Sequence, residues 1–131
     1  MMYNAKHEEM KAEAREDIID ALERGYSGYY CDLHHEVFNT DFYIVGTEMA
    51  KDALREYDVF EAIELVQDYE RNVLGAIYTD LSNPERIINM IYYIIGEEVI
   101  NEMLHKSEAF SERWNDYADD ETNEAILMDI K

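Results

Sequence analysis

The strongest constraint on the fold is a helix start followed by a long apolar segment. Ser82-Asn83-Pro84-Glu85 combines a capping residue, a proline in the first turn, where its missing N–H removes no helical hydrogen bond, and a glutamate three residues after the serine. From Ile87 to Ile100 the apolar residues lie almost all round the helix. This segment is too short for a membrane span and contains polar residues, so it predicts a buried central helix over about 84–106.

Helical periodicity predicts further helices on both sides of this segment. Apolar residues recur at helical spacing over about 5–24, and Gly25 marks the end of that helix. We expect other helices over 29–38, 47–57, 58–74 and 108–117, with an extended connector at 42–45. The inward stripe of the 58–74 helix comprises Val59, Ala62, Ile63, Val66 and Val73. The sequence therefore predicts an all-α fold, a single compact bundle of five or six helices around a central apolar helix.

The chain shows no internal repeat and no Gly/Ser- or Pro-rich linker. With 131 residues it falls in the size range of one domain, and we expect a single helical domain over 1–117. Residues 118–131 are expected to form an acidic tail with a short apolar terminal segment. That segment, Ala125 to Met128, needs cover, either from its own domain or from a second copy in a homodimer.

The net charge limits the partners that this chain can bind. The chain has 31 Asp and Glu residues but 11 Lys and Arg residues, which gives a formal net charge of −20. Direct binding to nucleic acid or to an anionic membrane is therefore unfavourable, and a partner should present a basic surface. The single cysteine, Cys31, and the absence of an apolar signal segment in residues 1–11 predict a cytoplasmic protein.

Five acidic residues of the first helix form a row. They advance by 4, 3, 4 and 3 residues, so they fall within a strip roughly 80° wide at 100° per residue. The row spans about 21 Å with a charge every 5 Å or so, against one charge per about 3.4 Å along a single DNA strand. We call these residues the acidic ridge: Glu9, Glu13, Glu16, Asp20 and Glu23.

A second row, Glu61, Glu64 and Asp68, follows Asp58. We predict that this row and the acidic ridge form a partner-binding surface with tyrosines at its margin. The net charge approximates that of about ten base pairs of duplex DNA, which makes DNA mimicry one interpretation, while a solvated acidic surface that maintains solubility is the other. The acidic pattern continues in later helices at Glu98, Glu102, Glu108, Glu112 and Asp116.

Motifs that support chemistry are sparse. Cys31-x-x-His34, Asp32-x-x-His35 and Glu102-x-x-His105 have spacings suited to metal ligands, and a carboxylate-bridged metal protein using Glu102, His105, Asp32 and His35 is one alternative. Acidic residues and histidines often fall close together by chance in so acidic a chain, so we expect no metal ligands. The sequence has no phosphate-binding glycine loop and no nucleophile elbow, so we expect no catalytic residue, no cofactor and no enzymatic activity.

Two stretches resemble small acidic proteins encoded by phages and prophages. They are Asp32-Leu33-His34-His35-Glu36-Val37-Phe38-Asn39-Thr40-Asp41, and Asp80-Leu81-Ser82-Asn83-Pro84-Glu85 with the following Tyr92-Tyr93-Ile94-Ile95-Gly96-Glu97-Glu98. More loosely, an acidic, mostly helical chain with a Tyr-Tyr pair followed by Asp is similar to the Ocr-type antirestriction proteins of phages. Those proteins are dimeric DNA mimics that occupy the DNA-binding channel of restriction enzymes.

The acidic rows and this resemblance together imply a phage-type anti-defence protein in the cytoplasm of a bacterial host. It would block the basic nucleic-acid-binding cleft of a restriction or CRISPR–Cas enzyme. The alternative is a non-enzymatic regulatory protein that binds a partner by shape, through apolar contacts around Ile126 to Ile130 or through its tyrosines.

Overall fold

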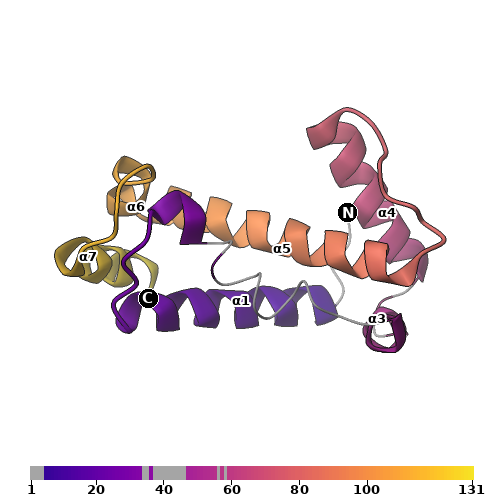
Figure 1. Cartoon of the computed structure of the whole chain (residues 1–131), viewed down its shortest axis with the longest axis horizontal. Helices are drawn as coiled ribbons and strands as arrows, with labels where there is room; N and C mark the ends of the chain where they lie inside the picture. The colour runs from indigo at the N-terminus through magenta and orange to yellow at the C-terminus, as the bar shows by residue number, and fades with distance from the viewer. Residues whose placement is uncertain (1–4, 34–35, 37–46, 56, 58) are drawn as a thin grey trace.

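Six α-helices make up the fold, which the computed structural model describes for residues 5–33, 36, 47–55, 57 and 59–131 (Figure 1). The expected all-α fold class is confirmed. A short 3₁₀ helix, η1, and a π-helical turn, η2, complete the described elements. The bounds are α1 Ala5–Glu23, η1 Tyr30–Asp32, α3 Thr47–Arg55, α4 Val59–Tyr69, η2 Glu70–Leu74, α5 Pro84–Lys106, α6 Glu108–Glu112 and α7 Asp120–Ile130.

Helix α5 is the centre of the bundle, as the sequence predicted. It packs against α1, α3, α4, α6 and α7, and α1 runs alongside it for much of its length (Figure 1). Asn83, and not Ser82, caps its start, because the Asn83 side chain accepts the Glu85 N–H at 3.0 Å and Pro84 follows directly. Its buried residues are Ile87, Ile88, Ile91, Ile94, Ile95, Gly96, Val99, Ile100 and Met103.

Helix α1 buries one face against α5 and α7 and ends at a glycine. Gly25 has a φ of 84°, in the left-handed region that favours glycine. Its N–H donates to the Leu22 carbonyl at 3.2 Å, and the Tyr26 N–H donates to the Ala21 carbonyl at 3.0 Å. These two hydrogen bonds form a Schellman motif, which turns the chain and directs Tyr26 back over the last helical turn.

The predicted 58–74 helix changes its hydrogen bonding at Glu70. Ala62 and Val66 are buried as expected, and Leu65 is buried beside them. Val73, predicted to point inward, is 61% exposed. Val73 lies in the π turn, where hydrogen bonds join residues i and i+5. The α-helical spacing that places Ala62 and Val66 on the inward face ends at Tyr69, so it does not place Val73 on that face.

The C-terminal residues do not form a tail, which corrects the expected division at residue 117. Helix α7 packs against α1, α5 and α6, and Ile126 and Ile130 are buried. The apolar C-terminal segment is therefore partly covered by its own chain, through Ile126, while Met128 is exposed. Ser107 joins this region to α6, because its hydroxyl accepts the Phe110 N–H at 3.1 Å and donates to Asp129 at 2.8 Å.

Two other expected helices are shorter in the structure. Helix α3 ends at Arg55, and α6 spans only Glu108–Glu112. Of the helix expected over 29–38, the structure describes Tyr29, the 3₁₀ segment Tyr30–Asp32, Leu33 and Glu36, while the connector at 42–45 lies outside the described residues. In the part of the chain that is described, no helix combines the length and apolarity needed to cross a membrane.

Candidate partner-binding surface

The acidic ridge lies on the exposed face of α1. All five of its side chains are exposed, and the row is centred roughly opposite the buried face that contains Met10, Ala14 and Ile18. Two ridge carboxylates at its C-terminal end have cationic partners: Asp20 lies 2.8 Å from Arg24, and Glu23 lies 2.6 Å from Lys131. The remaining ridge residues present carboxylates without a cationic partner among the described residues: Glu9, Glu13 and Glu16.

The structure places the second acidic row apart from the ridge. Glu64 is exposed, whereas Glu61 and Asp68 are half-buried, and Asp68 lies 3.8 Å from Arg71. Helix α4 packs on α5 and α3, whereas α1 packs on α5 and α7, and the two helices lie on different sides of α5 in Figure 1. Because α1 and α4 pack on different sides of α5, the eight predicted residues divide between two surfaces.

An ion ladder between α1 and α5 was missed in the sequence. His7, Lys11 and Arg15 face Glu98 and Glu102: His7 Nε2 lies 2.9 Å from Glu98, Lys11 Nζ 2.5 Å from Glu102, and Arg15 Nη2 2.8 Å from Glu102. Glu98 and Glu102 therefore face cations and do not extend the acidic surface. The i, i+4, i+8 spacing of the three α1 residues was the signal that could have revealed them.

Burial and hydrogen bonding act in opposite directions on this ladder. Burial disfavours the ionised form of Glu102, but hydrogen bonds and positive charge from Lys11 and Arg15 outweigh it and lower the pKa of Glu102. Burial likewise disfavours charged Lys11, yet the Glu102 carboxylate raises the pKa of Lys11 above its ordinary value. Both partners are therefore held in their charged forms.

The residues of the alternative metal site have other contacts. Glu102 accepts hydrogen bonds from Lys11 and Arg15, and the exposed His105 ring places Nδ1 2.7 Å from the Asn101 carbonyl oxygen. Asp32 is exposed and Cys31 is half-buried, while His34 and His35 lie outside the described residues. Within the described ranges, no three His, Cys, Asp or Glu side chains form a group that could hold a metal ion.

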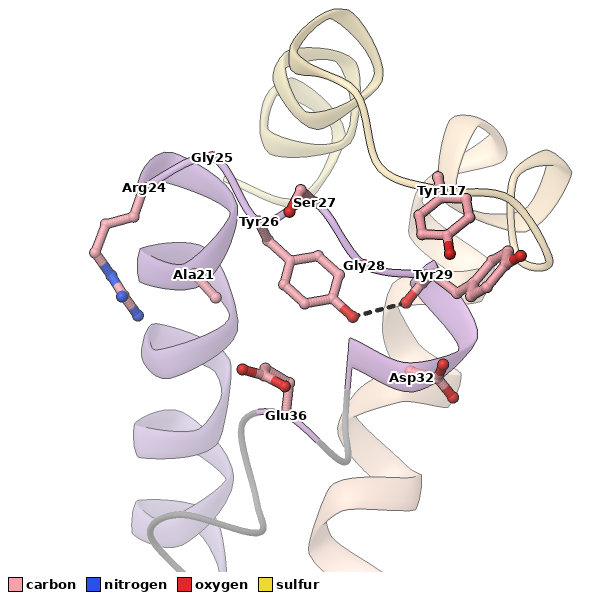
Figure 2. Close-up of a pocket in the computed structure, with 10 residues that line it drawn as sticks. All are labelled: Ala21, Arg24, Gly25, Tyr26, Ser27, Gly28, Tyr29, Asp32, Glu36 and Tyr117. Atoms are coloured by element: carbon pink, nitrogen blue, oxygen red, sulfur yellow. Dashed lines mark hydrogen bonds between the residues drawn. The ribbon is translucent and has the colours of Figure 1, made fainter.

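A cavity of about 590 Å³ opens between the C-terminal end of α1 and η1 (Figure 2). We call it the tyrosine pocket. The Tyr26 hydroxyl donates to the Tyr29 carbonyl oxygen at 2.8 Å, and the Tyr29 and Tyr117 rings lie with their centroids 3.9 Å apart. The lining residues are Ala21, Arg24, Gly25, Tyr26, Ser27, Gly28, Tyr29, Asp32, Glu36 and Tyr117.

Two local features of the sequence set the position of the Tyr26 ring. The Schellman motif directs Tyr26 toward Ala21, and Gly28 leaves room for the ring. A Cβ atom added at Gly28 would lie 2.5 Å from the Tyr26 hydroxyl oxygen, which is too close for any contact of this kind. A larger residue at position 28 would therefore displace the ring.

Contacts with the C-terminal region complete the pocket. The Tyr30 N–H donates to the Asp116 carbonyl at 3.0 Å, and the Ala118 N–H donates to the Gly28 carbonyl at 2.9 Å. These bonds bring Tyr117 beside Tyr29. Buried Asn123 adds a side-chain link, since it accepts the Tyr30 hydroxyl proton at 2.7 Å and donates to the Tyr26 carbonyl at 3.0 Å.

Acidic groups dominate the electrostatics of the tyrosine pocket. Burial, followed by the negative charges of Glu36 and Asp32, raises the pKa of Tyr26 to about 12. The one basic residue in the lining, Arg24, donates to Asp20 at 2.8 Å. Asp32 and Glu36 are exposed and have no cationic partner in the described part of the chain.

No protein-family model, no curated protein and no solved structure matches the chain.

Proposed function

We propose that this chain is an anti-defence inhibitor that binds the basic nucleic-acid-binding cleft of a host restriction or CRISPR–Cas enzyme, with the acidic ridge in place of phosphates. It acts by occupying the cleft and performs no chemistry of its own. The resemblance to phage-encoded acidic proteins points to a role against a host defence enzyme. The acidic ridge provides the carboxylates that would bind the enzyme's basic residues. Affinity would come from pairing carboxylates with Lys and Arg and from releasing the counterions held on both surfaces.

One observation carries the proposal: five carboxylates share the exposed face of a single helix, opposite the face that packs. Like charges at this spacing oppose helix formation by a few tenths of a kcal/mol per pair, so the ridge does not serve the stability of α1. Glu102 pairs with cations and Glu70 is buried, whereas all five ridge carboxylates face solvent. An exposed row of this kind favours a cationic partner.

The experiment is a capture assay from nuclease-treated bacterial lysate, with the tagged chain washed at rising salt and challenged with a short DNA duplex. The ridge variant carries Glu9→Lys, Glu13→Lys and Glu16→Lys, which are exposed and have no described cationic partner. The matched control carries Glu48→Lys, Glu112→Lys and Glu124→Lys, which change the net charge equally at exposed positions of three other helices. Circular dichroism verifies that both variants are folded.

We expect the wild type and the control to retain a nucleic-acid-binding enzyme that the duplex displaces and that elutes as salt rises. The ridge variant should lose it. Equal capture by the ridge variant, or a retained protein that resists both salt and duplex, would overturn the proposal.

A second candidate function is shape-based binding of a partner through apolar contacts. The expected apolar surface at Ile126 to Ile130 is reduced to Met128, which is exposed, because both isoleucines are buried. Four large apolar side chains are exposed instead along the π turn and the loop after it: Val73, Leu74, Ile77 and Tyr78. Complexes made through this patch would resist salt, so the same washes separate the two functions.

A further inference from the structure

The tyrosine pocket lies where the backbone itself favours a cation. It opens at the C-terminal end of α1, and Ala21 and Gly25 line it. The carbonyl end of a helix carries a partial negative charge equivalent to about half an elementary charge, which stabilises nearby cations. The last turn of the helix has no basic residue, and Arg24, which follows it, donates to Asp20.

Two carboxylates add full charges to the pocket. Asp32 and Glu36 are one helical turn apart in sequence, and Figure 2 shows the Glu36 carboxylate directed into the space below the Tyr26 ring. After burial, the charges of Glu36 and Asp32 contribute to the raised pKa of Tyr26. Neither carboxylate is neutralised by a described cation.

The aromatic rings supply flat surfaces beside these charges. Gly28 allows the Tyr26 ring to fold into the cavity, where its hydroxyl is held by the Tyr29 carbonyl (Figure 2). Tyr29 and Tyr117 are exposed at the rim. A planar guanidinium group can stack on a tyrosine face while its N–H groups donate to carboxylates, a combination that the compact ammonium group of lysine matches less well.

We propose that the tyrosine pocket binds the guanidinium group of an arginine side chain from the protein partner, with Glu36 as the hydrogen-bond acceptor, Tyr26 as the stacking surface and Asp32 adding negative charge at the rim. The identity of the ligand as a partner's arginine rests on the proposed function, because nucleic-acid-binding clefts present arginine to phosphates. The pocket lies at the end of the same helix that carries the acidic ridge, so one partner can engage both.

The test titrates the isotopically labelled full chain with N-acetyl-arginine amide and follows backbone amide resonances. We expect saturable shifts at Ser27, Gly28 and Tyr29, and no such shifts with N-acetyl-citrulline amide, which has the same shape and no charge. The double variant Asp32→Asn/Glu36→Gln should weaken binding about tenfold or more. The matched control, Glu48→Gln/Glu64→Gln, loses the same charge on α3 and α4 and should bind as the wild type does.

Gly28→Ala tests the stacking surface separately, because the added Cβ displaces the Tyr26 ring while both carboxylates remain. We expect weaker binding with an unchanged circular dichroism spectrum. Shifts caused equally by the citrulline compound, or arginine binding unchanged in the Asp32/Glu36 variant, would overturn the inference. Because the probe replaces the partner, a failure here leaves the ridge proposal intact, and a failure of the capture assay leaves the guanidinium site intact.

Discussion

Lys11 and Glu102 form an ion pair across the packed faces of α1 and α5, with Nζ 2.5 Å from Oε1. Lys11 is 8% exposed, so its ammonium group depends on this partner more than a surface lysine would. The chain has a net charge of −20 and few basic residues, and the Lys11 ammonium group pairs with an acid between two packed helices.

Removing the carboxylate should destabilise the protein. We expect Glu102→Gln to lower the free energy of unfolding by about 1–2 kcal/mol, between the values typical of exposed and of fully buried pairs. The measurement is urea denaturation at neutral pH. As a control, Asp20→Asn breaks the Asp20–Arg24 pair, whose side chains are 64% and 70% exposed, and should cost less than about 0.5 kcal/mol. Equal losses in the two variants would contradict the assigned role of burial.

The same pair should make stability depend on pH. Because the folded-state pKa of Glu102 lies below its ordinary value of 4.5, its contribution is fully present above that value and is lost as the pH falls through the folded-state pKa. We expect the difference in unfolding free energy between wild type and Glu102→Gln to be constant near neutral pH and to shrink below about pH 4. Denaturation series at several pH values measure it, and the subtraction cancels the titration of acids present in both proteins. A difference that stays constant at low pH would be inconsistent with ionic pairing.

Glu70 should control the loop after the π turn. Its side chain is fully buried, and its carboxylate accepts the N–H groups of Tyr78 at 2.5 Å and Thr79 at 3.0 Å. In Glu70→Ala both amides lose their acceptor, so we expect their hydrogen exchange to accelerate about tenfold or more and the protein to lose about 1–3 kcal/mol of stability. Exchange measured residue by residue by NMR tests this.

Asp80→Asn provides the control for that prediction. Asp80 accepts hydrogen bonds from Ser82 in the adjacent turn and makes none to Tyr78 or Thr79 in the structure. Exchange at Tyr78 and Thr79 should therefore be unchanged. Acceleration of the same size in both variants would mean that the loop responds to any local change.

Tyr30 and Asn123 should be energetically coupled. Both are buried, and Asn123→Ala leaves the Tyr30 hydroxyl and the Tyr26 carbonyl without their partner. We expect this change to cost about 1–3 kcal/mol, and Tyr30→Phe to cost less in the Asn123→Ala background than in the wild type. Denaturation of the four proteins completes the double-mutant cycle, and strictly additive losses would rule out the coupling.

Local sequence patterns are sufficient to predict the helical class and the central helix. The start of α5 follows from local chemistry, since Pro84 begins the helix, and its central position follows from apolar residues almost all round it. The end of α1 could also be predicted from the sequence, because Gly25 adopts a left-handed conformation that favours glycine. The ridge was also predictable, since residues on one helix face are related by spacing alone.

Packing between helices determines which acids face solvent and which pair with a cation. Glu102 and Lys11 are 91 residues apart in sequence, so no local pattern pairs them, and helical spacing alone grouped Glu102 with the free acids. The π turn that exposes Val73 and the close approach of Tyr29 to Tyr117 likewise depend on packing between distant segments. Helical periodicity is a property of neighbouring residues, whereas charge neutralisation and pocket formation depend on which faces the folded chain brings together.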